Sequence, residues 1–252
     1  MMGNQQAQEA QYSFPYHWLP VLADDGRLLT LGKSLEWGLE YYSYVSTVAD
    51  MARQRRPSSI LDVGCGDGRV TDALFRAAPS VQRCVGVDYS ERAIALARMF
   101  GNQSIDFQNR PLSEVPGEFD LVTLIEVYEH IPPDDAMVFL RDVVSKLAPG
   151  GALLVSVPSV NVPVNEKHYR HFSLELLHEE VVACGNVKLE YVTYCHSTSK
   201  LAEWLRRIMI NRVWTLNDSG MQRVLIRLYD RFFKYASEER GAHVVALFVR
   251  PR

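Results

Sequence analysis

From Ser58 onward, short apolar runs alternate with segments whose apolar residues recur at helical spacing. The apolar runs predict buried strands, and the segments between them predict amphipathic helices. The predicted strands are 60–63, 84–87, 105–108, 120–125, 152–157, 188–194 and, last, 243–249. The predicted helices are 70–77, 91–99, 134–147 and 174–184, with Ser90 and Ser173 as N-caps and Pro149-Gly150-Gly151 as a helix end. Such alternation with short turns is typical of a mainly parallel sheet.

Two further segments flank this pattern. The stretch 12–19 is aromatic, and 32–53 reads as a helix with Leu35, Leu39, Tyr42 and Val45 near helical spacing. We therefore expect 1–53 to form an N-terminal tail and helical cap, with 1–11 disordered, and 54–252 to form the main domain. Within that domain, about 197–240 is helical and basic, which predicts an insertion before the last strand. The insertion packs on the sheet or forms a homodimer contact; the alternative is peripheral contact with a membrane surface or an anionic substrate.

Composition narrows the class of protein. The chain has 252 residues, 47% of them hydrophobic, and a net charge of −3, so it can bury a full core and shows no global preference for polyanions. Its four cysteines form no C-x-x-C pair, and Cys65 and Cys84 fall in core segments, which fits buried thiols in a reducing compartment. The N-terminus is polar, and no apolar run reaches membrane-spanning length. These features predict a soluble, cytoplasmic protein.

A glycine-spaced turn follows the first strand of the alternating pattern. Gly64, Gly66 and Gly68 have G-x-G-x-G spacing, which differs from the G-x-G-x-x-G of dinucleotide-binding loops. Asp62 lies inside the preceding strand, where a carboxylate suits an amine-bearing ligand better than a pyrophosphate. Asp88 closes the next strand, and its two acceptor oxygens suit the hydroxyls of a ribose. The sequence therefore predicts a nucleoside site beyond the carboxyl ends of the strands.

Four motifs in combination give a more specific match. L-D-V-G-C-G-D-G, V-G-V-D-Y-S, F-D-L-V-T-L-I-E and L-A-P-G-G occur in this order from residue 61 to residue 151. Together they resemble the class I S-adenosylmethionine-dependent methyltransferases over about 58–194 plus the last strand. The resemblance implies an α/β, Rossmann-like fold: a seven-stranded, mainly parallel sheet with helices on both faces. It also implies S-adenosylmethionine as the cofactor.

The same resemblance assigns roles around the cofactor. Gly64 and Gly66 would let the loop contact the methionine part, Asp62 would support the loop and the cofactor's amino end, and Asp88 would bind the ribose. Tyr89 would lie against the adenine. The family often has an acidic residue after the third strand, but Pro111 stands there, so backbone groups or Asn109 would hold the adenine. The full implied set is Asp62, Gly64, Cys65, Gly66, Asp88, Tyr89, Asn109 and Glu126.

A second group of polar residues follows the fourth strand. Glu126, Glu129 and His130 share one face if the segment is helical, and they could bind a divalent metal or supply a base. A downstream cluster follows the fifth strand: Asn161, Asn165, Glu166, Lys167, His168, Tyr169, Arg170 and His171.

This E-x-x-E-H run with a downstream His-Phe resembles two families. They are the small-RNA 3′-terminal 2′-O-methyltransferases and the ubiquinone-biosynthesis O-methyltransferases. The first implies that Glu126, Glu129, His130 and His171 are catalytic and bind magnesium or manganese, with His168 competing for the fourth place. Alternatively, His130 is a metal-free base or a structural residue, and His171 anchors the turn into the next helix.

The acceptor is the least defined part of the reaction. Overall acidity disfavours RNA, although the basic insertion weakens that objection. We expect a hydroxyl on a small molecule or saccharide, such as a natural product, a glycan or a quinone-like compound. The aromatic residues of the cap either stack over this acceptor or form the core of the cap: Tyr16, His17, Trp18, Trp37, Tyr41 and Tyr42. The alternatives are a metal-dependent RNA ribose 2′-O-methyltransferase and a non-catalytic scaffold that holds the cofactor.

Overall fold

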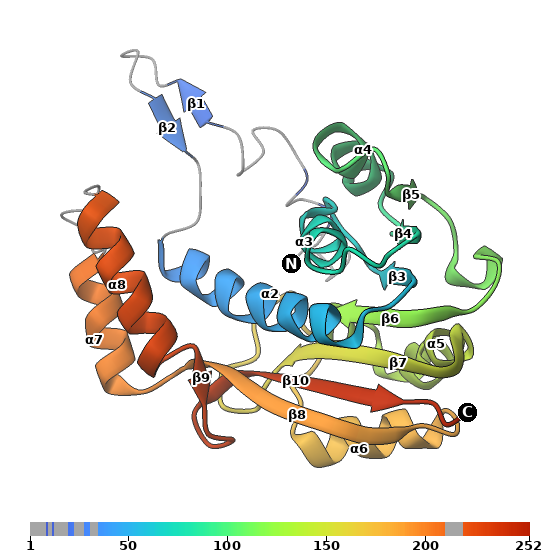
Figure 1. Ribbon diagram of the computed structural model, residues 1–252. Helices are drawn as coiled ribbons and strands as arrows, with labels where there is room; N and C mark the ends of the chain where they lie inside the picture. Colours follow the sequence, from blue (N-terminus) through green and yellow to red (C-terminus); the bar gives the residue numbers. More distant parts are fainter. Residues whose placement is uncertain (1–8, 10–11, 13–19, 23–27, 31–34, 210–218) are drawn as a thin grey trace.

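The computed structural model describes residues 9, 12, 20–22, 28–30, 35–209 and 219–252 (Figure 1). Its main sheet has eight strands in the order β5-β4-β3-β6-β7-β10-β8-β9, and β1 (Pro20–Leu22) and β2 (Leu28–Thr30) form a separate two-stranded sheet. The main strands are β3 (Ser59–Val63), β4 (Arg83–Val87), β5 (Asp106–Gln108), β6 (Phe119–Ile125), β7 (Leu147–Pro158), β8 (Lys188–Ser197), β9 (Tyr235–Ala236) and β10 (Gly241–Val249).

The sheet combines a parallel and an antiparallel part. Strands β5, β4, β3, β6 and β7 pair in parallel, whereas β10 is antiparallel to both β7 and β8. The seven predicted strands are all present, and the two-residue β9 adds an eighth at the edge beside β8. The last strand in the sequence is therefore inserted between two earlier strands, which brings its side chains close to those of β7.

Helices cover both faces of the sheet, as predicted (Figure 1). One face packs against α2 (Leu35–Arg55), α3 (Arg69–Ala77) and α4 (Glu91–Phe100). The other packs against α5 (Pro133–Ser145) and α6 (Leu174–Ala183). The predicted N-caps are confirmed, since the hydroxyl oxygens of Ser90 and Ser173 each accept a hydrogen bond of 3.2 Å from a backbone N–H three residues later.

One local prediction is wrong. Helix α5 ends at Ser145, and Pro149-Gly150-Gly151 lies within β7, where Gly150 has a φ of +77° beside a shift in the β6–β7 register. The positive φ of Gly150 fits an irregularity in the strand pairing. It does not end α5, because that helix stops at Ser145. Within α2, Tyr42 is 37% exposed, because the buried side of the helix runs through Leu39, Tyr44 and Val48.

The segment between β8 and β9 forms two helices, α7 (Lys200–Met209) and α8 (Ser219–Phe232). They pack on α2 rather than on a face of the sheet, because Leu205, Leu225 and Tyr229 share a cluster with Leu39. Of the predicted N-terminal features, the tail apart from Glu9 and the aromatic stretch apart from Tyr12 lie outside the described residues. None of the described helices is long and apolar enough to cross a membrane.

Candidate active site

A cavity of about 750 Å³ opens beyond the carboxyl ends of β3, β4 and β6. Its walls come from the glycine loop after β3, the end of β4, the segment after β6, the loop between β7 and α6, and the first half of α2. One end holds most of the predicted cofactor residues, and the other holds the acidic and histidine side chains. This is the place where parallel α/β sheets bind ligands.

The loop between β3 and α3 depends on glycine. Gly64 and Gly66 have φ values of +74° and +55°, and the N–H of Gly64 donates to Val87 O at 2.8 Å. A Cβ on Gly64 would lie 2.5 Å from a methyl group of Val127. The left-handed backbone and this close approach together exclude larger side chains. Cys65 lies in the same loop and lines the cavity, and burial raises the pKa of its thiol well above the usual range.

Asp62 supports the loop from below. Its side chain is buried, accepts hydrogen bonds from Thr71 Oγ1 at 2.6 Å and Thr123 Oγ1 at 2.7 Å, and does not line the cavity. Burial raises the pKa of this carboxyl to about 6. These two hydrogen bonds fit the predicted role of Asp62 in supporting the loop. Its contact with the amino end of the cofactor stays a prediction.

Asp88, the residue expected to bind the ribose, connects the end of β4 to the glycine loop. Its two carboxylate oxygens accept from the N–H groups of Gly66 at 2.9 Å and Ser90 at 2.8 Å, and each oxygen keeps a further lone pair. Burial raises the pKa of Asp88. Tyr89 beside it is 65% exposed and lines the cavity, so its ring is available for stacking.

Asn109 stabilises the end of β4 from outside the cavity lining. Its side-chain N–H donates to Asp88 O at 3.0 Å and Tyr89 O at 2.9 Å. The residues after it, Arg110 and Pro111, line the cavity in its place. Tyr12, which the motifs did not identify, also lines the cavity and approaches Gly66 closely.

At the other end, Glu126 does not share a helix face with Glu129 and His130. It has a φ of +55°, and the chain between it and α5 contains only the short 3₁₀ segment Tyr128–His130. Its carboxylate accepts from Ser156 Oγ at 2.6 Å and lies 3.0 Å from His243 Nδ1.

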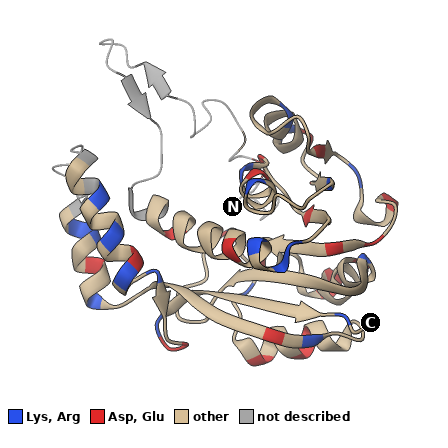
Figure 2. Cartoon of the chain, viewed as in Figure 1, with Lys and Arg blue, Asp and Glu red and all other residues tan. Residues whose placement is uncertain are grey.

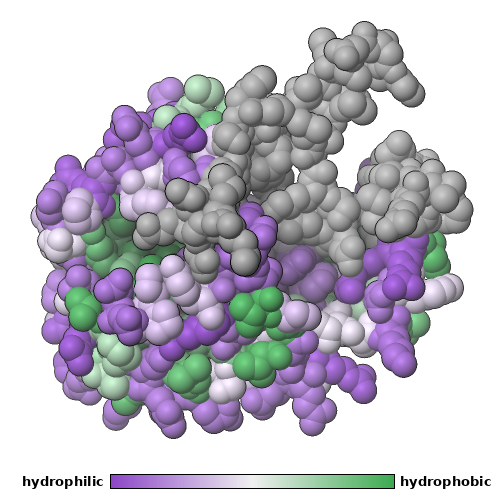
Figure 3. Space-filling view, turned by 180° about the vertical axis from the view of Figure 1, so that it is seen from behind, coloured by the Kyte–Doolittle hydropathy of each residue, from purple (hydrophilic) through white to green (hydrophobic). Residues whose placement is uncertain are grey.

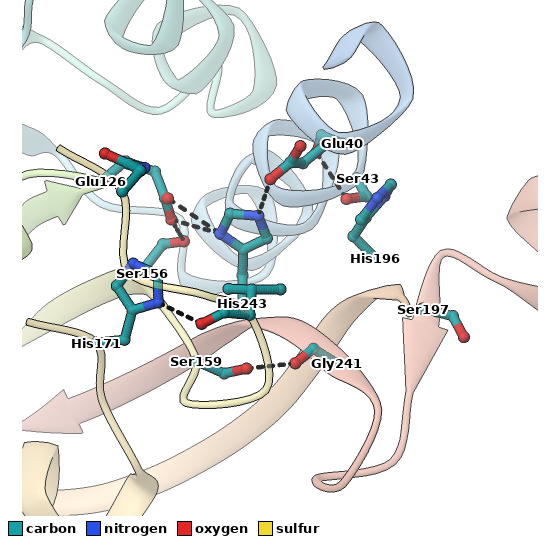
Figure 4. A network of polar contacts seen from close by, with 12 residues as sticks. Glu40, Ser43, Glu126, Ser156, Ser159, His171, His196, Ser197, Gly241 and His243 are labelled. Carbon is teal, nitrogen blue, oxygen red and sulfur yellow. Dashed lines mark hydrogen bonds and ion pairs between the residues drawn. The ribbon is translucent and has the colours of Figure 1, made fainter. Parts of the chain in front are cut away.

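His243 lies between two carboxylates that come from distant parts of the chain (Figure 4). Its Nδ1 faces Glu126, and its Nε2 lies 2.9 Å from Glu40 Oε1 on α2. Burial alone would lower the pKa of His243, but Glu126 and Glu40 outweigh it and raise the pKa to about 10. The imidazolium therefore balances one of the two negative charges in this wall.

Glu129 is a buried carboxyl beside the cavity. It is 1% exposed, and its Oε2 has no hydrogen-bond partner among the described residues. Burial and the neighbouring Glu126 raise its pKa well above the usual range. The neutral acid is therefore favoured, and the residue lines the cavity with one oxygen that no described residue binds.

Backbone carbonyls determine the tautomers of three histidines. A carbonyl oxygen only accepts, so His130 Nδ1, 2.9 Å from Lys167 O, and His171 Nδ1, 2.9 Å from Val162 O, carry protons. His171 Nε2 then accepts from His168 Nδ1 at 2.8 Å. Both His130 Nε2 and His168 Nε2 are left with a lone pair, the latter 3.2 Å from Asn165 Nδ2. Burial lowers the pKa of His130 and, to about 4, that of His168, so both rings are neutral.

Among the described residues, the structure brings together a different group of candidate metal donors from the expected one. Donor atoms of Glu129, His130 and His168 all lie within 4.8 Å of one another. Glu126 lies outside this group because Ser156 and His243 bind its carboxylate, and His171 lies outside because its ring nitrogens contact Val162 O and His168. His168, the competing candidate, thus takes the place expected for His171.

Sequence reasoning missed Glu40 and His243. One signal was available for His243, because it is the only ionisable residue in the apolar run 242–249. An ionisable residue within a buried strand usually has a partner.

Comparison with known proteins identifies the family. A family model described as a methyltransferase domain matches residues 38–209, more than half of the chain. Ubiquinone biosynthesis O-methyltransferases of Bordetella avium and Xanthomonas euvesicatoria are 29% and 33% identical to it over 121 and 120 residues, in each case 45% of this chain. These regions are 48% and 46% of those proteins, so the chain spans about half the length of the curated relatives it matches.

Solved structures agree on the fold. The N-methyltransferase NodS of Bradyrhizobium japonicum, in complex with S-adenosylhomocysteine, has a TM-score of 0.62 and 17% identity, with all of both chains covered. The plantazolicin methyltransferase BamL, also with S-adenosylhomocysteine, has a TM-score of 0.58 and 15% identity over 86% of this chain and 88% of its own. The family model over residues 38–209, together with the glycine loop and the strand order, shows that the chain belongs to the class I S-adenosylmethionine-dependent methyltransferases.

Proposed function

We propose that this protein transfers the methyl group of S-adenosylmethionine to a hydroxyl of a small molecule or saccharide. The observation that supports this most is the neutral imidazole of His130, whose Nε2 lone pair lies at the acceptor end of the cavity. A hydroxyl acceptor must lose its proton as the methyl group is transferred. Apart from that proton transfer, the enzyme mainly has to align the acceptor oxygen, the methyl group and the sulfur. A neutral imidazole at physiological pH is suited to take that proton.

Glu129 complements His130 in this proposal. Its Oε1 lies 3.7 Å from His130 Nε2, so both groups can contact one acceptor hydroxyl. The neutral acid form of Glu129 would donate a hydrogen bond to an acceptor oxygen without adding negative charge near the attacking atom. The curated relatives are named O-methyltransferases, which favours the same atom type, although the NodS structure is of an N-methyltransferase.

A second candidate is metal-assisted O-methylation. The donors of Glu129, His130 and His168 fit a divalent cation, because Glu129 Oε2 has no described partner and His130 Nε2 presents a lone pair. His168 Nε2 accepts from Asn165 Nδ2 at 3.2 Å and would exchange that hydrogen bond for the cation. Two imidazole ligands favour manganese over magnesium. A bound cation would lower the pKa of an acceptor hydroxyl, and these three residues would hold it. The net charge of −3 gives no support to the RNA alternative.

The test uses labelled S-adenosylmethionine and panels of phenolic, saccharide and amine acceptors. Once an acceptor is found, His130→Asn and Glu129→Leu should lower kcat about a hundredfold or more, because the first removes the proton acceptor and the second removes the hydrogen-bond donor. Their affinity for S-adenosylhomocysteine, measured by calorimetry, should match that of the unmodified protein. Turnover of amines alone, or unchanged kcat in both variants, would contradict the proposal.

The metal candidate has its own measurement. Calorimetric titration with manganese should show binding that His168→Asn weakens, while His178→Asn, on α6 and outside the cavity lining, leaves it unchanged. A chelator should abolish turnover, and added manganese should restore it. Full activity in the presence of the chelator would rule out the metal and leave His130 as a base acting alone.

A further inference from the structure

Helix α7 is apolar over more of its circumference than the fold buries. Its residues Ala202 and Leu205 are buried against the rest of the protein, yet Leu201, Trp204 and Ile208 are 61%, 60% and 39% exposed. At about 100° per residue these three side chains lie on one side of the helix, next to the buried pair. The helix therefore presents a second apolar row to the outside.

Helix α8 repeats this arrangement. Leu225 and Tyr229 are buried, and a row at spacings of three and four residues is exposed. Its members are 52%, 50%, 41% and 62% exposed, in the order Met221, Val224, Leu228 and Phe232. Both helices of the pair therefore expose apolar side chains beyond those that pack on the rest of the protein. We call these two rows the apolar rows of α7 and α8.

Positive charge accompanies the apolar rows. Helices α7 and α8 contain six Lys or Arg and two Asp or Glu, a net charge of +4 in a chain whose total is −3 (Figure 2). Arg223, Arg227 and Arg231 follow one another at spacings of four along α8. All three are exposed, and none forms an ion pair with another described residue. They are therefore available to an anionic partner.

We propose that α7 and α8 dock on an anionic lipid surface. Amphipathic helices of this kind lie in the plane of the interface, with their apolar rows at the acyl boundary and their basic residues on lipid phosphates. Trp204 suits that depth, because an indole ring has an apolar body and a polar N–H. Seen from behind, most of the described surface is hydrophilic, so the apolar rows differ from the general surface (Figure 3).

A second copy of the chain fits these helices less well. A two-fold interface uses the same patch on both copies. It would place the Arg223, Arg227 and Arg231 rows of both copies at the rim of one contact, where like charges repel. A membrane of anionic lipids instead supplies opposite charge along the whole row.

Docking through these helices would also position the cavity. Leu39 on α2 packs with Leu205 and Tyr229, and the next residue, Glu40, lines the cavity. The helix pair and the acceptor end of the cavity therefore share one turn of α2. Lipid bound by α7 and α8 would therefore lie close to the cavity wall that contains Glu40. This position suits a methyl acceptor carried in or on the membrane, a step that rests on the proposed function.

The test is flotation of the full chain with vesicles of phosphatidylcholine alone and of phosphatidylcholine with phosphatidylglycerol. We expect binding to the anionic vesicles to exceed binding to the neutral ones by about tenfold or more, and to weaken with salt. Trp204→Gln with Phe232→Gln should reduce binding about tenfold or more, because two apolar anchors are lost. The matched control is Met99→Gln with Val138→Gln, whose side chains are 71% and 59% exposed on α4 and α5, and it should bind normally.

A triple variant tests the charge separately. Arg223→Glu, Arg227→Glu and Arg231→Glu change only exposed side chains and should reduce binding to anionic vesicles about a hundredfold. Absence of vesicle binding by the unmodified protein would overturn the proposal, as would equal loss in the Met99/Val138 control. Light scattering that shows a dimer, dissociated by the Trp204/Phe232 variant, would overturn it in favour of a contact between copies. None of these readouts depends on methyl transfer, so the docking proposal and the proposed function can fail separately.

Discussion

His243 on β10 lies 3.0 Å from the carboxylate of Glu126, the residue that follows β6. The two residues are 117 positions apart in the sequence, and the insertion of β10 beside β7 brings them together. Glu126 adopts a left-handed backbone conformation that is rare outside glycine. The ion pair and the Ser156 hydrogen bond both hold this conformation at the junction between the cofactor and acceptor ends of the cavity.

His243→Gln should lower the free energy of unfolding by about 2 kcal/mol at pH 7, because it leaves the partly buried carboxylates of Glu126 and Glu40 without their cation. The pH dependence follows from the pKa of about 10, which lies above the usual 6.5. The contribution of His243 to stability is complete below pH 6.5 and is lost as the pH rises through about 10. Urea titrations at several pH values should show a steeper decline for the unmodified protein than for the variant.

Glu40→Gln is the control for this prediction. It removes one carboxylate and keeps the Glu126–His243 pair, so its stability loss at pH 7 should be smaller than that of His243→Gln. Equal pH dependence of the unmodified protein and His243→Gln would show that His243 is neutral in the folded state.

Asp88→Asn should weaken S-adenosylhomocysteine binding by about ten- to a hundredfold, as expected when hydrogen bonds to a charged acceptor are lost. The variant removes the charge expected to face the ribose and weakens the bond to Gly66 N–H. Calorimetry measures this directly. Asp106→Asn on β5 makes the same charge change at an exposed position outside the cavity lining, so its affinity should be unchanged. Equal affinities for the two variants would remove Asp88 from the cofactor site.

The cofactor end could be predicted from the sequence because each residue there follows a strand directly. Gly64, Gly66 and Asp88 lie at consecutive strand ends, so their proximity depends only on parallel pairing. The acceptor end depends on contacts between distant segments. The Glu40–His243 contact spans 203 positions and requires both the place of β10 and the register of α2, which no local pattern contains.

The shared helix face fails at Glu126 itself, whose φ of +55° takes its backbone out of the right-handed helical region. At the other end, Pro132 disfavours helical backbone at Ile131, which is extended with a ψ of 127°. The segment after Glu126 therefore makes only one 3₁₀ turn before α5 begins. His168 was harder to assign than His130, because its place depends on the fold of the loop between β7 and α6.

Gly64→Ala should destabilise the protein by about 1–3 kcal/mol, since it places a Cβ in the left-handed region and against Val127. Gly38→Ala is the matched control within α2, where a Cβ meets no atom within 4 Å. It should stabilise the protein by about 0.5–1 kcal/mol, because alanine favours a helix. Thermal unfolding of both variants measures the difference. Adding Val127→Ala to Gly64→Ala should recover only the part of the loss that is due to the clash.

Glu129→Gln separates the chemical role of this residue from its effect on stability. A carboxyl whose pKa is raised in the folded state contributes stability below its unfolded pKa, and this is lost as the pH rises toward the folded value. Glutamine is a neutral substitute of the same shape, so the variant should be at least as stable as the unmodified protein at pH 8. The difference should shrink at pH 5, and methyl transfer should be largely kept at both, because the amide N–H replaces the acid O–H as the hydrogen-bond donor. Glu129→Ala, which leaves a cavity, should lose stability at both pH values. Urea titration at pH 5 and pH 8 makes the comparison, and a Gln variant less stable at pH 8 would show instead that Glu129 is ionised and stabilised in the fold.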